Sequence, residues 1–166
     1  MADERLTTLV VSERELADIE TLLEKLLFDA HANFGMVLDR SGQLIATKGK
    51  VPQCDLVILG ALVAGTFASA RELAKALNEE DFHVLFQQGN EQHVITTLVE
   101  EQWLLSIIFD QRAYLGLVKV LAKETAQELV TILQQVRSHS EAQQLLAKKD
   151  VTTSVEHKID ALFRDS

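Results

Sequence analysis

Cysteine, proline and aromatic residues are scarce in this chain of 166 residues, which has one cysteine, one proline and an aromatic content of 5%. A single thiol, Cys54, cannot form a disulfide within the chain, and this agrees with a reducing compartment. Residues 1–9 contain neither a basic leader nor a signal-type apolar segment, and we find no apolar run of the about 20 residues that cross a bilayer. We therefore expect a cytoplasmic protein without membrane insertion.

Positive charge is also in short supply, because 16 basic residues face 25 acidic ones and the formal net charge is -9. The longest basic run is Lys148-Lys149. Nucleic acids and anionic membranes are approached through concentrated basic patches, so neither is an expected partner. The hydrophobic content of 47% allows one globular domain with a sizeable core and a modest appendage.

Catalytic signatures are missing as well. The sequence has no Gly-rich phosphate loop, and its adjacent acidic residues lie between predicted elements, where carboxylates are usually solvated. The five histidines show no metal-ligand spacing and no neighbouring cysteine: His31, His83, His93, His139 and His157. The sequence therefore predicts no enzymatic activity, no catalytic residue, no cofactor and no metal site.

Apolar spacing and turn residues predict an α+β fold. Ser12 and Glu15 have the spacing of a capping box that begins an amphipathic helix ending near Asn33, and Arg40-Ser41-Gly42 predicts a tight hairpin. The remaining elements are expected as strands 34–39, 43–47, 82–88, 93–99 and 103–109, and as helices 54–78 and 115–137. Short links indicate antiparallel strands, so helices should sandwich a five-stranded antiparallel sheet in the order α-ββ-α-βββ-α.

One of these strands is a candidate dimer edge. Residues 82–88 are apolar on both sides, with Phe82, Val84 and Phe86 alternating along the run. An edge strand offers unpaired backbone groups to another chain. If this strand lies at the sheet edge, it favours pairing of two copies.

Residues 54–78 read as one helix, capped at Asp55, with two unlike faces. One face is expected to cover the core and carries Leu59, Leu62, Val63, Thr66, Ala70, Leu73 and Leu77. The other is a bare strip that precedes three polar side chains: Ala61, Ala64, Gly65 and Ala68, then Arg71, Glu72 and Lys75. A glycine inside a helix costs about 1 kcal/mol against alanine, so the strip favours close approach by another protein. The alternative is a second layer of the same domain, or alanines chosen for helix propensity.

The two ends of the chain are predicted to differ from the domain at 12–137. We expect residues 1–11 to be flexible and residues 138–166 to form a tail, in which polar residues 138–152 are a tether. Thr153 with Glu156 predicts a short helix at about 153–164 whose apolar face carries Val155, Ile159, Leu162 and Phe163. A helix of about a dozen residues is marginal alone, so this face should contact its own domain, a sister protomer or a partner, or else the segment stays disordered.

Several short segments resemble the roadblock/LC7 family, and within it the bacterial MglB-type branch. They are the hairpin Leu38-Asp39-Arg40-Ser41-Gly42-Gln43-Leu44-Ile45, the helical Leu62-Val63-Ala64-Gly65, and Ile108-Phe109-Asp110 followed by Leu115-Gly116-Leu117-Val118. The resemblance covers about residues 13–137, and Ile159-Asp160-Ala161-Leu162-Phe163 is similar to the C-terminal segment of that branch.

The resemblance implies a sheet with one helix on one face and two on the other, which pairs as a homodimer through the third strand and second helix. It implies that the paired second helices form a platform for a small Ras-like GTPase of the MglA type, in cell polarity or motility control. By this resemblance Ala68 and Glu72 face the GTPase, whereas Ala61, Ala64 and Gly65 lie nearer the helix pair. The resemblance further implies that the C-terminal segment contacts the GTPase and influences nucleotide exchange.

The mechanism expected from the resemblance is activation without an arginine from this chain. Arg71 is the candidate for an arginine finger on the helix, but MglB-type activators reshape the GTPase so that its own residues reach the phosphate. We therefore favour a rim or solvated role for Arg71. Two other functions stay open, a roadblock scaffold that assembles partners without changing hydrolysis and a ligand sensor of the PAS or profilin kind.

Overall fold

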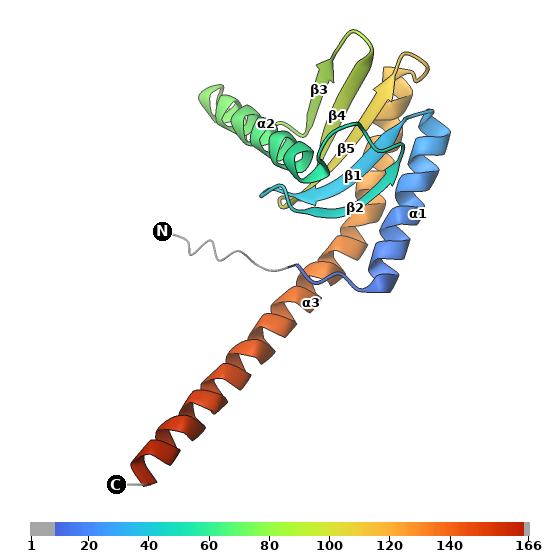
Figure 1. Cartoon of the computed structure of the whole chain (residues 1–166). Helices are drawn as coiled ribbons and strands as arrows, with labels where there is room; N and C mark the ends of the chain where they lie inside the picture. The colour runs from blue at the N-terminus through green and yellow to red at the C-terminus, as the bar shows by residue number, and fades with distance from the viewer. Residues whose placement is uncertain (1–8, 165–166) are drawn as a thin grey trace.

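Five antiparallel strands form one sheet in the order β2-β1-β5-β4-β3. The structure is a computed structural model that describes residues 9–164. Its element order is the one predicted from the sequence (Figure 1). The elements are α1 Glu13–Ala30, β1 Phe34–Asp39, β2 Leu44–Gly49, α2 Leu56–Ala76, β3 Val84–Gln88, β4 Gln92–Val99, β5 Trp103–Asp110 and α3 Leu115–Arg164.

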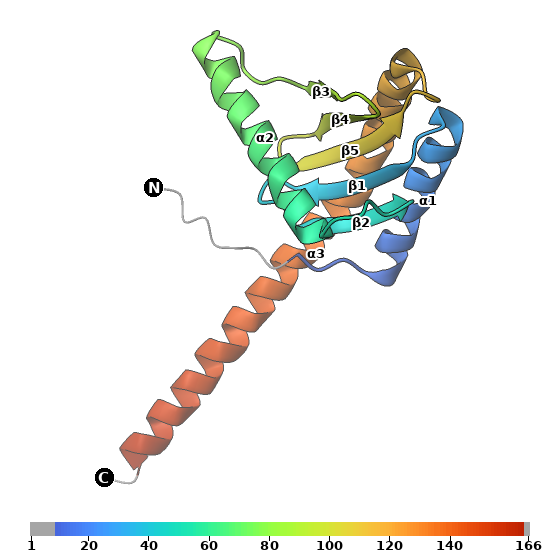
Figure 2. The ribbon, with the colours of Figure 1, turned by 45° about the horizontal axis from the view of Figure 1, so that its top comes forward.

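Helices cover both faces of the sheet, one on one side and two on the other, as the resemblance implied (Figure 2). The alternation of β1 shows how this arises, because Phe34 and Met36 pack in the cluster that contains Phe67 of α2. Val37 instead belongs to the larger cluster that α1 and α3 contribute to. A central strand covered on both faces has apolar residues at nearly every position, and β1 and β5 are buried in this way.

The start of α1 confirms the predicted capping box. Ser12 Oγ accepts a hydrogen bond from the Glu15 backbone N–H at 3.2 Å, and the Ser12 N–H donates to Glu15 Oε2 at 2.9 Å. The helix ends at Ala30, earlier than expected, because His31 adopts a left-handed conformation with φ 56°. Both ends of α1 are therefore set by local hydrogen bonding and backbone geometry.

The β1–β2 hairpin lies against α2. Gly42 has φ 93°, and a Cβ built there would come within 2.9 Å of Ala61 Cα. On the helix side, a Cβ at Gly60 would come within 2.7 Å of the Gly42 carbonyl oxygen. Both glycines are needed for this close approach, and it fixes α2 against the edge formed by β1 and β2.

The C-terminal region differs from the prediction. We expected a helix that ends at residue 137, a tether over 138–152 and a separate short helix, but α3 is one helix of 50 residues from Leu115 to Arg164. The physical reason is that residues 138–152 are polar yet contain no glycine or proline, and Gln, Leu, Ala and Lys favour helix. The boundary of the domain at residue 137 itself stays a prediction.

The N-terminal prediction is wrong for residues 9–11. Leu9 and Val11 pack against the core, and the Val10 N–H donates to Ser140 Oγ at 2.9 Å. Two apolar side chains and a backbone hydrogen bond hold this segment on α3, whereas its sequence has no periodic pattern that would indicate it. Residues 1–8 of the segment predicted to be flexible lie outside the described residues.

Candidate docking surface on α2 and β3

The inner face of α2 combines small residues, one aromatic side chain and partly buried aliphatic side chains, among them Leu59 and Val63. Asp55 caps the helix as predicted, since its Oδ1 accepts hydrogen bonds from the N–H groups of Val57 at 2.8 Å and Ile58 at 3.3 Å. Along the helix, Ala64, Phe67 and Ala74 are buried, and the first two belong to the cluster that contains strand residues. Phe67 is the largest buried side chain of α2, and Leu56, Leu59 and Val63 pack against the same cluster.

The outer face of α2 is apolar as well, and it is exposed. It carries large aliphatic side chains, of which Leu62 is 63% exposed, together with small residues between them. A Cβ built at Gly65 would have no heavy atom within 4 Å apart from its chain neighbours and the nearby backbone of α2 itself. We call this surface the α2 outer face, and it consists of Val57, Ile58, Ala61, Leu62, Gly65, Ala68, Leu73 and Leu77.

This arrangement corrects the predicted division of α2 into two faces. Leu62, Thr66, Leu73 and Leu77 were expected in the core but are exposed. Ala64 was assigned to the bare strip but is only 4% exposed, so it cannot contact a partner directly while α2 stays on the sheet. When apolar residues run around most of a helix, spacing alone cannot tell which stripe faces the sheet.

The remaining predicted contact residues on α2 lie on or beside the outer face. Ala61, Gly65, Ala68, Glu72 and Lys75 are all exposed. Glu72 and Lys75 form an ion pair of 2.7 Å at the C-terminal end of the helix. A polar rim next to an apolar surface is the usual organisation of a protein interface.

Arg71 differs from these residues because another part of the domain holds it. Its side chain is 43% exposed, and its Nε lies 3.3 Å from Asp81 Oδ2 in the segment that leads to β3. The same carboxylate oxygen pairs with Arg40 Nη2 of the β1–β2 turn, also at 3.3 Å. Asp81 therefore links α2, the hairpin and the approach to β3, and sequence reasoning missed it because no motif marks a carboxylate shared between distant arginines.

The strand beside α2 is open on one side. β3 lies at the sheet edge and pairs with β4 only, and Val84 is 41% exposed. Phe86 is half-buried, because its ring stacks on Phe109 with centroids 6.2 Å apart. Phe82 precedes the strand, which begins at Val84 and not at residue 82 as expected. Among the three predicted edge residues, Val84 therefore offers the most exposed side chain.

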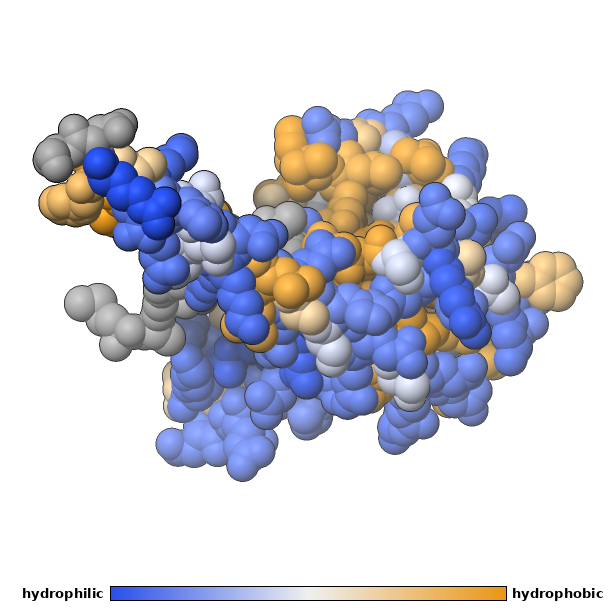
Figure 3. Space-filling view, turned by 90° about the horizontal axis from the view of Figure 1, so that it is seen from below, coloured by the Kyte–Doolittle hydropathy of each residue, from blue (hydrophilic) through white to orange (hydrophobic). Residues whose placement is uncertain are grey.

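The apolar character of α2 has a further consequence. Over Leu56–Ala76 the helix is long and apolar enough to cross a membrane by length and composition alone. This contradicts the expectation that no apolar run reaches that length. One such helix is weak support for a membrane span, and here its inner face already packs on the sheet. In the view of Figure 3, hydrophobic residues interrupt the polar surface in several places.

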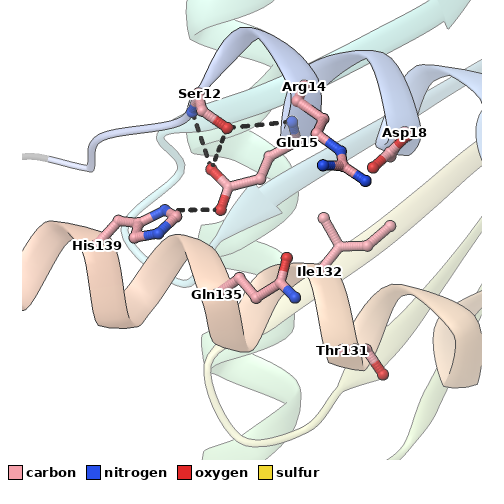
Figure 4. Close-up of a pocket in the computed structure, with 8 residues that line it drawn as sticks. All are labelled: Ser12, Arg14, Glu15, Asp18, Thr131, Ile132, Gln135 and His139. Atoms are coloured by element: carbon pink, nitrogen blue, oxygen red, sulfur yellow. Dashed lines mark hydrogen bonds and ion pairs between the residues drawn. The ribbon is translucent and has the colours of Figure 1, made fainter.

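A polar pocket of about 540 Å³ lies between α1 and α3, on the other side of the sheet (Figure 4). Glu15 points from α1 toward His139 of α3, and its Oε1 lies 2.8 Å from His139 Nδ1. Burial by itself raises the pKa of the Glu15 carboxyl, but hydrogen bonds from Ser12 and the nearby His139 outweigh it and lower that pKa. The described residues contain no group of three or more metal-ligating side chains. These contacts secure the helix pair.

A second polar cluster joins the α1–β1 and β5–α3 links. Arg112 donates from Nε and Nη2 to the Asp110 carboxylate, and the Asn33 side-chain amide donates to Asp110 Oδ2 at 3.0 Å. These donors hold the pKa of Asp110 far below its ordinary range. Arg112 is exposed, whereas Asp110 and Asn33 are half-buried, so the cluster joins the two links at the surface of the domain.

The predicted tail residues lie on the protruding part of α3. Val155, Ile159, Leu162 and Phe163 are exposed, so the described part of their own domain does not cover them, which was one of the alternatives. In the sequence, these residues are also distant from those of the α2 outer face. What covers them stays a prediction.

Comparisons with known proteins agree with this geometry. The Roadblock/LC7 domain family matches residues 18–109. MglB from Myxococcus xanthus is 33% identical, with a TM-score of 0.69, and the match covers 73% of this chain and 98% of that one. The gliding protein mglB from Thermus thermophilus is 30% identical, with a TM-score of 0.72, and the match covers 77% of this chain and 97% of that one.

A further solved structure, described as MglB with a tetrameric arrangement, is 30% identical with a TM-score of 0.73. That match covers 78% of this chain and 97% of the other. No curated protein sequence matches the chain. The chain is thus similar over most of its length to three proteins described as MglB.

Proposed function

The chain belongs to the Roadblock/LC7 family, and from this premise we propose that it is an MglB-like homodimer that binds a small Ras-like GTPase of the MglA type and stimulates its GTP hydrolysis. The observation that carries the proposal is the α2 outer face, an exposed apolar surface beside an open sheet edge. Large exposed apolar surfaces on a soluble domain mark interaction sites. The chain itself supplies no catalytic group in this proposal.

Pairing of two copies uses the β3 edge and part of α2. The unpaired backbone groups of β3 would hydrogen-bond to β3 of the second copy, so that two five-stranded sheets become continuous. Val84 lies on that edge and would be covered by the pairing. The same approach brings the two α2 helices side by side, which removes part of their aliphatic surface from water.

The GTPase then binds on the platform formed by the two α2 helices. Ala61, Gly65 and Ala68 are exposed and small, so the backbone of a partner can come close to the helix. Glu72 and Lys75 border this strip and supply the polar rim. Direct contact through Ala64, in contrast, would require α2 to leave the sheet.

Activation in this proposal comes from selective binding and not from an arginine finger. A finger must extend into the nucleotide site of the GTPase, but Arg71 is tied to Asp81 at the side of α2. The homodimer instead binds the hydrolysis-competent conformation of the GTPase more tightly than its other conformations. The rate gain is then limited by the ratio of the two affinities.

The cellular setting that we propose is the cytoplasm, in control of polarity or motility. The Thermus relative is described as a gliding protein. Because this chain is similar to that relative, the description supports motility as its cellular process.

Hydrolysis measured with a matched pair of variants tests the proposal. Ala68→Arg places a long charged side chain on the platform, whereas Ala17→Arg places it on an exposed alanine of α1, on the other side of the sheet. With an MglA-type GTPase we expect the native chain and Ala17→Arg to accelerate hydrolysis, and Ala68→Arg to lose most of that acceleration. Equal loss in both variants, or no acceleration by the native chain at any concentration, would refute the proposed activity and favour a scaffold.

A further inference from the structure

The last part of α3 protrudes from the domain as an exposed helix (Figure 1). Ser140 is the last buried residue of the part that the structure describes, and from residue 141 to 164 all positions are exposed except Gln144, which is half-buried. Several of the exposed side chains are large and apolar, including Leu145, Val155 and Ile159. We call residues 141–164 the α3 extension.

Four of the large apolar side chains of the α3 extension follow a seven-residue spacing, whereas Leu146, Val151 and Phe163 lie outside it. Leu145 and Ile159 lie seven residues before and after Thr152, and Val155 and Leu162 stand three residues after Thr152 and Ile159. Residues alternating three and four apart make a single seam along a helix, as in coiled coils. The seam consists of Leu145, Lys148, Thr152, Val155, Ile159 and Leu162.

A helix with such a seam is only marginally stable when water surrounds it. Helical stability in proteins comes mostly from packing of an apolar face, and the described part of the domain does not lie beneath this face. We propose that the α3 extension pairs in antiparallel fashion with the α3 extension of a second copy of the chain. This pairing does not depend on the proposed GTPase.

Lys148 sets the antiparallel orientation. In a parallel pair each seam residue faces its own counterpart, so two Lys148 ammonium groups would meet in the seam. In the antiparallel pair Lys148 faces Ile159 of the second copy, and its aliphatic stem can cover that side chain while the charge stays in water. The same alignment sets Leu145 against Leu162 and Thr152 against Val155, each twice by symmetry.

Charges beside the seam set the register. Lys149 and Glu156 flank the seam on the same side, and the alignment brings Lys149 of each chain next to Glu156 of the other. A slip of seven residues in one direction would bring Lys149 against Lys149, and a slip in the other direction would bring Glu156 against Glu156. Among these three alignments, only the one that joins Leu145 to Leu162 brings opposite charges together, as two symmetry-related Lys149–Glu156 pairs.

Disulfide trapping tests the pairing and its direction in the full chain. Two variants in a Cys54→Ser background, Leu145→Cys and tagged Leu162→Cys, are mixed in a glutathione buffer. Within one helix the two positions are about 25 Å apart and cannot form a bond to each other. We expect the mixed disulfide to exceed either homotypic disulfide at least fivefold. Equal amounts of the three products, or mainly homotypic ones, would overturn the antiparallel pair.

A charge exchange in these same two variants tests the register. Lys149→Glu alone and Glu156→Lys alone should each reduce the mixed disulfide severalfold, and both changes together should restore it. The control is Asp160→Lys, which lies on the side of the helix away from the seam and should leave the yield unchanged. Circular dichroism confirms that helix content is retained. Identical yields in all variants, or single changes that reduce GTPase binding but not trapping, would assign the seam to another partner and refute the pairing.

Discussion

Two glycines on α2 are predicted to respond to the same substitution with opposite signs. Gly65→Ala adds a methyl group that meets nothing within 4 Å beyond the nearby backbone of α2 itself, so the protomer should gain about 1 kcal/mol from helix propensity. Gly60→Ala adds the methyl group 2.7 Å from the Gly42 carbonyl oxygen, which is backbone and cannot move aside cheaply. Relief of that overlap costs about 1–3 kcal/mol, so Gly60→Ala should be less stable than the native chain despite the better helix former.

Urea and thermal denaturation at several protein concentrations measure both effects, because concentration dependence separates protomer stability from dimer association. Gly65→Ala should raise the melting temperature by about 2–4 °C when association does not contribute, while it weakens docking on the α2 outer face. Gly60→Ala should lower stability at every concentration. If the two variants were equally stable, the close packing of the hairpin on α2 would be wrong. If Gly65→Ala bound the GTPase and a second copy as well as the native chain, no partner would approach the helix closely at that point.

Three further predictions concern the polar contacts. Asp81→Ala removes both ion pairs of a largely buried carboxylate and should lower the free energy of unfolding, measured by urea denaturation, by about 1–2 kcal/mol. An unchanged urea midpoint would show that these ion pairs contribute nothing to stability. Asp110 has a lowered pKa in the folded chain, so its contribution to stability is complete above the ordinary carboxyl pKa of about 3.9 and is lost as pH falls below it. Asp110→Asn should therefore make the free energy of unfolding fall less steeply as the pH is lowered in the acid range. An acid dependence identical to that of the native chain would contradict this. Ser12→Ala breaks the capping box and should cost about 1 kcal/mol in thermal unfolding, which a melting temperature equal to that of the native chain would refute.

The fold could be predicted because local signals and the global pattern agree. Ser12 with Glu15 and Asp55 mark helix starts through hydrogen bonds that involve only neighbouring residues. Gly42 marks a turn because a positive φ favours glycine over other residues. The order of elements follows from such signals, and the antiparallel sheet follows from the short links between them.

The docking surface was predicted only in part, for reasons that lie in the three-dimensional packing. Ala64 and Leu62 are both apolar and two positions apart, and only the packing against the sheet shows that the first is buried and the second exposed. The link through Asp81 joins residues far apart in the sequence. The continuous α3 was missed because a polar stretch reads as a tether, although polar residues without glycine or proline continue a helix readily.

Nucleotide-dependent binding of an MglA-type GTPase tests the central claim most directly. The purified chain is titrated with the GTPase loaded with GDP or with a non-hydrolysable GTP analogue, and light scattering gives the mass of the complex. We expect tight binding of the GTP-analogue form alone, with two copies of the chain for each GTPase, and we expect Ala68→Arg to abolish it. Equal affinity for the two nucleotide states, or no binding to either, would contradict the account of a platform that selects the hydrolysis-competent GTPase.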